Sequence, residues 1–314
     1  MTEKLKTFRS TAQKQGRALH QPIPATDPLP NRPNLIYTLC LDAPEAEGQR
    51  LLAKMFISSL LRTYFTGDII VFRNSPNPLF PVERKGLQEV YVETPDLTGD
   101  QGAEQAWCYK YLLAEGLEVS GYDKVAFFDS DMLALRNIDH LFEGEWDIAY
   151  QPESGHSGDE STYSAFYSDS ELELAGKRVG VNSGSLAVRA EIFHEVMRKW
   201  QRIDEGRRIR NNGFWDQASW NKLLLTKTKE PSARSVDGGA QSEPGCQPWS
   251  ALPFPTGEIR FPMYLDLDYR IYTKAAMTHN CGGNTLTKID FTFGLYMRTF
   301  YCDPTGLFFN ILEM

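Results

Sequence analysis

Tyr122-Asp-Lys-Val-Ala-Phe-Phe-Asp-Ser-Asp-Met-Leu-Ala-Leu-Arg-Asn-Ile-Asp-His-Leu-Phe142 is the stretch that decides the fold. Val125–Phe128 is an apolar run typical of a buried strand, and Met132–Leu135 continues it. Between the two runs lie Asp129 and Asp131, whose side chains on an extended chain would point to the same face. Two carboxylates this close are costly unless a cation lies between them. Oxygen ligands suit Mg²⁺ or Mn²⁺ that holds a diphosphate, so we predict a metal–diphosphate site here.

The same spacing of two acids occurs a second time, so context has to separate the copies. Asp266 and Asp268 lie in the polar, tyrosine-rich segment 263–270, where we expect a surface or turn feature. Asp129 and Asp131 instead interrupt an apolar strand, and ligands of α/β proteins bind at the ends of such strands. We therefore interpret only the first copy as functional.

Predicted strands and helices alternate before this stretch. Asn34–Asp42 is predicted as a buried strand, and Gly48–Phe65 has the apolar spacing of a helix. Asp68–Phe72 and Glu89–Glu93 are predicted as two further strands. This order predicts an α/β fold with a mostly parallel central sheet flanked by helices. Because no Gly-x-Gly-x-x-Gly follows the first strand, we do not expect a glycine-rich turn to hold a nucleotide.

The chain after the acid pair alternates again and contains two polar insertions. We predict the insertions as loops, at 153–177 and 226–257, because they carry few apolar residues. The first is interpreted as a mobile loop over the site. One helix before the acid pair, and two strands and two helices after it, complete the prediction. The last helix is predicted to be capped near Asp216. These elements lie at Asp147–Tyr150 and Val179–Arg189 (strands) and at Glu104–Glu118, Glu191–Ile203 and Phe214–Leu225 (helices).

Length, charge and cysteine content limit the class of protein. The 314 residues suffice for one large α/β domain, which we expect at 34–314 after a mobile, proline-rich arm at 1–33. The net charge of −8 argues against nucleic acid as a partner. No run of 18 apolar residues spans a membrane, although the basic arm allows a weak peripheral membrane contact. Five scattered cysteines and no apolar leader favour a cytoplasmic protein.

The segment 123–142 resembles the Asp-x-Asp segment of glycogenin-like and lipopolysaccharide-galactosyltransferase-like retaining glycosyltransferases of the family 8 type. That family has a single Rossmann-like GT-A domain, uses a nucleotide-sugar donor and binds Mn²⁺. Its other motifs occur here in the same order, across residues 107 to 283. They are Lys110, Asn182-Ser183-Gly184, Asp216-Gln217 and His279. Each motif alone has a simpler explanation, namely a solvated helix lysine, a turn, a helix N-cap and a satisfied polar histidine. The ordered set supports the resemblance.

The resemblance implies a role for each residue. Asp129, Asp131 and His279 would ligate Mn²⁺ or Mg²⁺, which would neutralise charge on the leaving nucleoside diphosphate. Gln217 and Asp216 would be the catalytic pair at the anomeric carbon. The residues implied to bind substrate are Lys110, Asn182, Ser183, Gly184 and Gly282, and those implied to bind the nucleotide are Thr38, Leu39, Cys40, Asp129 and Ser130. The implied reaction moves a hexose from a nucleotide-sugar, UDP-linked in the family, to a glycan or small-molecule acceptor by front-face substitution.

Two departures from the family keep alternatives open. A lysine commonly follows the metal-binding histidine by six residues in the family, whereas this chain has Thr285 there and Lys288 as its nearest lysine. The tyrosine that stacks on the base is missing near Gln49. One alternative is a catalytically idle nucleotide-sugar-binding protein. The other is an Asp-x-Asp phosphatase, although that motif normally opens the chain instead of lying in its middle.

Overall fold

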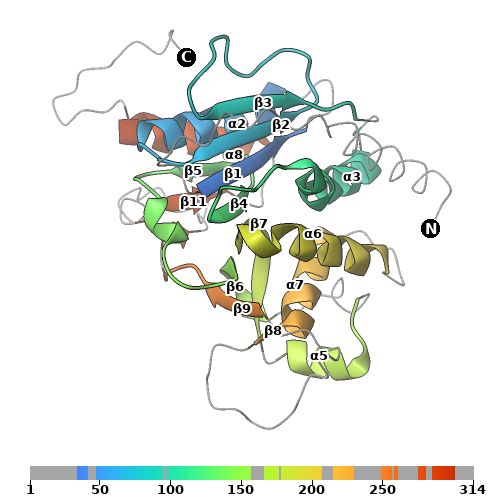
Figure 1. The fold of residues 1–314 in the computed structure, drawn as a ribbon. Helices are drawn as coiled ribbons and strands as arrows, with labels where there is room; N and C mark the ends of the chain where they lie inside the picture. Colours follow the sequence, from blue (N-terminus) through green and yellow to red (C-terminus); the bar gives the residue numbers. More distant parts are fainter. Residues whose placement is uncertain are drawn as a thin grey trace. The chain divides into compact units, whose positions relative to one another are not determined.

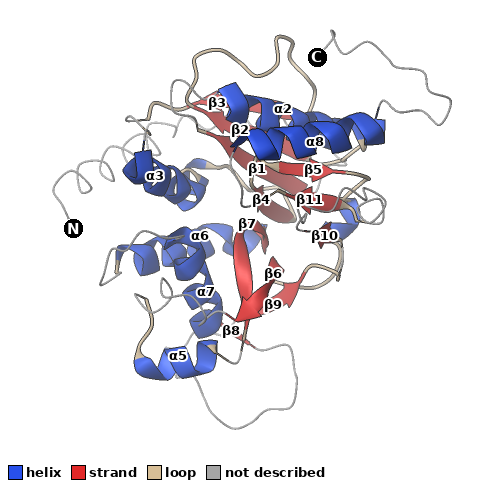
Figure 2. Ribbon diagram, turned by 180° about the vertical axis from the view of Figure 1, so that it is seen from behind, coloured by secondary structure: helices blue, strands red, loops and turns tan. Residues whose placement is uncertain are grey.

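The structure is a computed structural model. It describes residues 34–41, 47–94, 97, 99–156, 166–176, 178–206, 215–229, 249–256, 258–260, 275–280 and 285–300. The predictions for the N-terminal arm, for Asp266 and Asp268 and for Gly282 lie outside these residues. Strands and helices alternate along the described chain, and most of its strand pairs are parallel (Figures 1 and 2). The predicted α/β class, with a mostly parallel sheet flanked by helices, is confirmed.

The chain divides into two compact units, each assembled from segments that are distant in the sequence. Unit 1 contains the described residues of Leu97–Phe127 and Gly144–Phe254. Unit 2 contains those of Leu29–Asp96, Phe128–Glu143 and Pro255–Met314. The single domain expected at 34–314 stays a prediction.

Unit 2 contains the predicted strand–helix–strand beginning. The three parallel strands β1 (Asn34–Cys40), β2 (Asp68–Arg73) and β3 (Leu87–Tyr91) lie in the order β3-β2-β1. Helix α2 (Glu47–Arg62) connects β1 to β2. β1 and β2 are buried over nearly their whole length, as expected for strands with continuous apolar runs. The βαβ prediction is therefore confirmed.

A small second sheet in unit 2 joins the acid-pair segment to the C-terminal part of the chain. β5 (Met132–Ala134) pairs antiparallel with β11 (Met277–His279), which pairs in parallel with β10 (Ile259–Arg260). The register places His279 opposite Met132. Strand pairing thus brings together residues that are almost 150 positions apart in the sequence.

Helices α2 and α8 (Thr285–Phe300) pack together against this small sheet (Figure 2). The Ser59 hydroxyl of α2 donates a hydrogen bond back to Phe56 and accepts one from the Ala134 N–H of β5, at 2.9 Å. The contact is surrounded by a buried apolar cluster, so both helices are held firmly by burial of apolar area. The cluster consists of Leu52, Met55, Leu133, Phe291, Leu295 and Tyr296.

Unit 1 contains a mixed group of strands in the order β4-β7-β6-β9-β8. β7 (Val179–Arg189) pairs antiparallel with β6 (Ile148–His156). β9 (Trp249–Pro253) lies parallel to both β6 and β8 (Thr228–Lys229). All but the last residue of β4 (Lys124–Phe128) belongs to this unit. The apolar run before the acid pair is thus the buried strand that its composition predicts.

Four helices accompany these strands. Helix α6 (Ala190–Glu205) buries one apolar face, and the ring of Trp200 on that face contacts Tyr111 and Trp220. Helix α3 (Gly99–Leu112) begins and ends earlier than predicted, and a short 3₁₀ helix, Ala114–Gly116, follows it. The remaining helices are α5 (Asp169–Ala175) and α7 (Trp215–Lys227). None of the helices in the described residues is long and apolar enough to cross a membrane.

Both predicted polar insertions contain regular structure, so these loop predictions were wrong in part. In 153–177, β6 continues to His156, and α5 begins at a capping box in which Ser168 and Glu171 bond each other's backbone N–H. In 226–257, β8 and β9 are strands. β9 forms by pairing with β6 and β8 by pairing with β9, and the composition of such short segments does not reveal this pairing. Residues 157–165 and 177 of the mobile loop expected over the site lie outside the described residues.

Candidate active site

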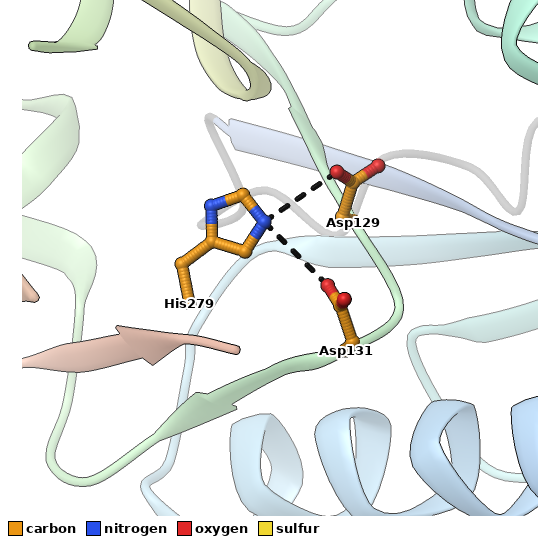
Figure 3. Close-up of side chains that lie close together, drawn as sticks. All are labelled: Asp129, Asp131 and His279. Atoms are coloured by element: carbon orange, nitrogen blue, oxygen red, sulfur yellow. Dashed lines mark ion pairs between the residues drawn. The ribbon is translucent and has the colours of Figure 1, made fainter. Parts of the chain in front are cut away.

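Unit 2 contains a candidate metal centre formed by Asp129, Asp131 and His279 (Figure 3). His279 Nε2 lies 3.5 Å from Asp129 Oδ2 and 3.5 Å from Asp131 Oδ1. The three potential ligand atoms all lie within 4.8 Å of one another. The pairing of β11 with β5 explains this convergence, because it sets His279 beside the residue that follows Asp131.

The two aspartates converge as expected, but not for the reason expected. They lie in a turn that follows β4, not on an extended strand, and the Met132 N–H closes this turn on the Asp129 carbonyl at 3.3 Å. The Asn280 N–H donates to the Asp131 carbonyl at 3.2 Å, which ties the turn to the end of β11. A turn and a neighbouring strand, instead of strand periodicity, therefore aim both carboxylates at His279.

The donor set fits a divalent cation. Asp131 Oδ1 is buried and accepts no hydrogen bond from the described part of the chain. The His279 side chain is 1% exposed and that of Asp129 is 31% exposed, so the centre is open on the side of Asp129. Two carboxylate oxygens and one imidazole nitrogen suit Mn²⁺ and leave coordination positions for phosphate oxygens. The chemistry of the residues thus agrees with the predicted ligands.

Lys288 of α8 adds a positive charge to this centre. Its Nζ lies 2.5 Å from Asp131 Oδ2, the carboxylate oxygen not directed at His279. In the resembled family a lysine lies six residues after the histidine. This chain has Thr285 at that position, and from the sequence Lys288 was noted only as the nearest lysine. Spacing could not reveal the contact, because it depends on where α8 packs.

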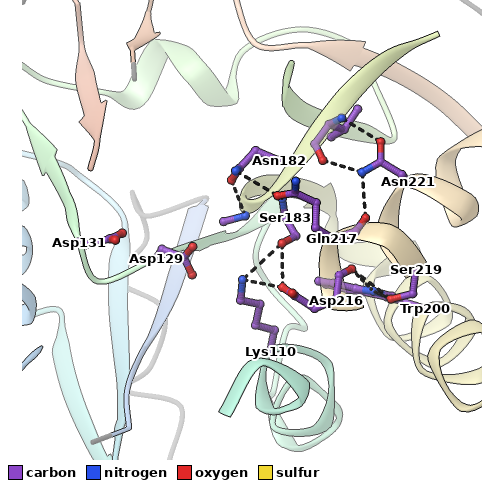
Figure 4. Close-up of polar contacts among 12 residues, drawn as sticks. Lys110, Asp129, Asp131, Asn182, Ser183, Trp200, Asp216, Gln217, Ser219 and Asn221 are labelled. Atoms are coloured by element: carbon purple, nitrogen blue, oxygen red, sulfur yellow. Dashed lines mark hydrogen bonds and ion pairs between the residues drawn. The ribbon is translucent and has the colours of Figure 1, made fainter. Parts of the chain in front are cut away.

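Unit 1 contains a second polar cluster, which begins with a buried ion pair (Figure 4). Lys110 Nζ lies 2.8 Å from Asp216 Oδ2 and 3.5 Å from the Ser183 hydroxyl. Ser183 Oγ donates to the same Asp216 oxygen at 2.7 Å. Lys110 also lies over the ring of Phe127, 5.0 Å from its centroid. Lys110 is therefore not a solvated helix lysine.

Asp216 is not the helix cap that its sequence position suggested. It lies in the first turn of α7, and its carboxylate bonds Lys110 and Ser183. Its backbone carbonyl accepts a hydrogen bond from the indole of Trp200 at 3.1 Å. A buried aspartate with a cation partner has a different role from an N-cap, whose oxygen satisfies the helix's own N–H groups.

Three side chains that carry amide or carboxylate groups continue the cluster. Gln217 Oε1 accepts from Asn182 Nδ2 at 3.2 Å, and Gln217 Nε2 donates to Glu153 Oε1 at 3.0 Å. Asn182 Nδ2 also lies 3.3 Å from the same Glu153 oxygen. Glu153 therefore fixes the orientation of both amides, because a carboxylate only accepts hydrogen bonds. Glu153 was not predicted as a site residue, because the polar composition of 153–177 predicts a loop.

Asn182-Ser183-Gly184, which alone would suggest a turn, is part of an irregularity in strand β7. Tyr150 of β6 pairs with Leu186, and the next residue, Gln151, pairs with Asn182. The three residues of β7 between these partners therefore have no counterpart on β6, so β7 bulges here. Asn182 Oδ1 accepts from the Gly184 N–H at 2.7 Å within the bulge. The bulge places the side chains of this segment next to α7.

The amide of Asn221 on α7 bonds the backbone of β7 beside the bulge. Its Oδ1 accepts from the Val181 N–H at 2.8 Å, and its Nδ2 donates to the Val181 carbonyl at 2.7 Å. Nδ2 also donates to the Gln217 carbonyl at 2.8 Å. This residue, which the sequence analysis did not single out, joins α7 to β7.

The predicted nucleotide-binding residues lie in unit 2. Thr38 and Cys40 are buried on β1, Leu39 between them is half-buried, and Ser130 lies in the turn of the metal centre. The binding roles assigned to these four residues and to Gly282 stay predictions.

Comparison with known proteins bears on the fold. No family model matches the chain, and no curated protein matches it. The crystal structure of galactosyltransferase LgtC, in complex with donor and acceptor sugar analogues, is similar to it. Its TM-score is 0.54 at 12% identity, and the match covers 86% of this chain and 98% of that chain. The fold is of the GT-A type. At this identity the likeness shows the fold alone, which agrees with the predicted fold.

Proposed function

We propose that the protein is a metal-dependent retaining glycosyltransferase that moves a hexose from a nucleotide-sugar to a glycan or small-molecule acceptor. The observation that carries the proposal is the convergence of Asp129, Asp131 and His279 on one point. The fold supports it, because that of LgtC, a galactosyltransferase, is similar. Retention, the UDP-linked donor and the hexose are taken from the family resemblance.

In this proposal the three ligands hold Mn²⁺ or Mg²⁺, which supplies positive charge to the leaving nucleoside diphosphate. Thr38, Leu39, Cys40 and Ser130 contribute to binding of the nucleotide, and Gly282 to binding of the substrate. A carboxylate pair without a cation is costly, which is the physical reason for a metal at this place.

We assign the unit 1 cluster to the sugar part of the donor. Asp216 and Gln217 are the proposed catalytic pair, and Lys110, Asn182, Ser183 and Gly184 the proposed binding residues. The support is that these polar groups are buried and bonded to one another, which fixes their orientation. Preorganised groups of this kind are what a binding site for a polar substrate needs.

A thermal-shift panel of nucleoside diphosphates and nucleotide-sugars, with and without Mn²⁺, tests the proposal. We expect a Mn²⁺-dependent stabilisation by one nucleotide class, worth about 2.7 kcal/mol at a ligand concentration of 100 Kd. Asp131→Asn should abolish the response while the protein remains folded. The matched control is Asp268→Asn in the second acid pair, which should respond like the wild type.

Turnover measurements separate the proposal from its alternatives. The ligand that stabilises the protein is incubated with Mn²⁺ and a panel of sugar acceptors, and released nucleoside diphosphate is measured. Binding without transfer or hydrolysis would support an idle binding protein. Hydrolysis of a phosphate monoester, without any response to nucleotide-sugars, would support a phosphatase. A folded protein that responds to none of these ligands would contradict the proposal.

A further inference from the structure

The carboxylate of Asp131 lies between two positions for positive charge. Its Oδ1 faces His279 at 3.5 Å, and its Oδ2 contacts the Lys288 ammonium at 2.5 Å. Because Lys288 uses Oδ2, only Oδ1 of this residue is directed at the other two metal ligands. The lysine therefore both orients the carboxylate and neutralises part of its charge.

Lys288 also changes the total charge of the centre. Asp129, Asp131 and Lys288 together carry one net negative charge, with His279 neutral as a metal ligand must be. A bound divalent cation would make the centre positive, so the ammonium repels the cation. Once a diphosphate is present, the same ammonium and the cation both attract it.

The ammonium is held near the centre by the packing of its helix. α8 contributes Phe291, Leu295 and Tyr296 to the buried cluster with α2. Asn280, the residue after His279, donates to the Thr292 hydroxyl one turn beyond Lys288. The Lys288 side chain is itself only 17% exposed. Because the ammonium cannot move into solvent when a cation binds, its repulsion should weaken cation binding strongly.

We propose that Lys288 couples cation and diphosphate binding: it weakens binding of the cation alone and strengthens binding of diphosphate to the cation-loaded centre. The inference rests on the proposed metal centre. In this inference Lys288 positions the Asp131 carboxylate and balances its charge, so that the centre does not bind the cation tightly before the donor binds. A lysine that served only the fold would not change the two affinities in opposite directions.

The test measures Mn²⁺ binding to the full chain by electron paramagnetic resonance, and inorganic pyrophosphate binding at saturating Mn²⁺ by calorimetry. We expect Lys288→Met to bind Mn²⁺ alone about tenfold more tightly and pyrophosphate about tenfold more weakly, within the usual range of coupling between sites. Lys288→Arg keeps the charge and should stay close to the wild type in both. The control Lys199→Met removes a lysine paired with Glu195 on α6 and should change neither.

The outcomes are distinguishable. If Lys288→Met unfolds, Lys288→Gln is measured in its place. Mn²⁺ affinity that is unchanged or reduced in the neutral variant overturns the inference, even if the wild type binds Mn²⁺. A wild-type protein that binds no Mn²⁺, with or without pyrophosphate, overturns the proposed metal centre and the inference with it. Opposite changes in the two affinities support both.

Discussion

Lys110 and Asp216 form an ion pair of 2.8 Å in which the two side chains are 6% and 4% exposed. The lysine lies on α3 and the aspartate on α7, and Ser183 of β7 contacts both. Burial of two charges costs several kcal/mol each, and only their mutual attraction and added hydrogen bonds offset that cost. A pair of this kind holds three elements of unit 1 in one arrangement.

Removal of one partner should therefore cost more than removal of both. We expect Lys110→Met or Asp216→Asn alone to lower the free energy of unfolding by about 3–5 kcal/mol, because each leaves an unpaired polar or charged group. The double variant should lose less stability than either single variant. Urea unfolding measures this coupling. The partly exposed i,i+4 pair Glu195–Lys199 provides the control cycle, with an expected coupling of about 0.5 kcal/mol.

Glu153 accepts hydrogen bonds from the amides of Asn182 and Gln217, so its loss should release both. We expect Glu153→Ala to lower the free energy of unfolding by about 1–3 kcal/mol, the cost of unsatisfied buried donors. The side-chain NH₂ resonances of the two amides should broaden or shift in NMR spectra. Glu145→Ala, an exposed position in the same unit, should change stability by less than about 0.5 kcal/mol. Unchanged amide resonances would show that Glu153 does not orient them.

Asn221 donates from Nδ2 to two carbonyl oxygens, those of Val181 and Gln217. Asn221→Asp keeps the size of the side chain but places an acceptor there, which only a protonated carboxyl can relieve. We expect a loss of about 1–3 kcal/mol at neutral pH. Burial would raise the pKa of the new carboxyl, so stability should partly return as pH falls through that pKa. Denaturation of both proteins between pH 5 and pH 8 measures the difference. A pH-independent loss would contradict this account.

The sequence predicted those parts of the fold that local pattern determines. The apolar runs of β1, β2 and β4 are buried strands, and the stripe of α6 faces the core. The candidate metal ligands were predicted because Asp129 and Asp131 occur together and the resemblance pointed to His279. Local pattern suffices for the strands, the helix and the acid pair, because each consists of neighbouring residues, whereas His279 required the resemblance.

Features that depend on packing between distant segments were not predicted. β9 is a short strand that pairs with β6, β8 is a short strand that pairs with β9, and the composition of both is typical of a loop. Glu153 acquires its partners because β6 continues past Pro152 and β7 bulges opposite Tyr150 and Gln151. Lys288 reaches Asp131 through the placement of α8. Local spacing carries no signal for such contacts.

Glu258 contacts Arg136 at 2.6 and 2.7 Å and His140 Nε2 at 3.1 Å, and its backbone carbonyl accepts from the first residue of β11. Burial alone would raise the pKa of this carboxyl, but hydrogen bonds and charge from Arg136 and His140 outweigh it and lower the pKa. A carboxyl whose pKa is lowered in the folded state stabilises the protein at pH values above its unfolded pKa. This stabilisation is lost as pH falls through the pKa of the folded state.

Glu258→Gln should therefore be less stable than the wild type at neutral pH, by at most about 1 kcal/mol because Arg136 is partly exposed. The difference should shrink as pH falls below the ordinary pKa of glutamate, about 4.3, and should disappear once pH is below the lowered pKa of the folded carboxyl. Thermal unfolding from pH 3 to pH 7 measures the gap, with Glu143→Gln, an exposed acid of unit 2, as the control. A gap that persists unchanged at low pH would mean that Glu258 acts through packing instead of charge.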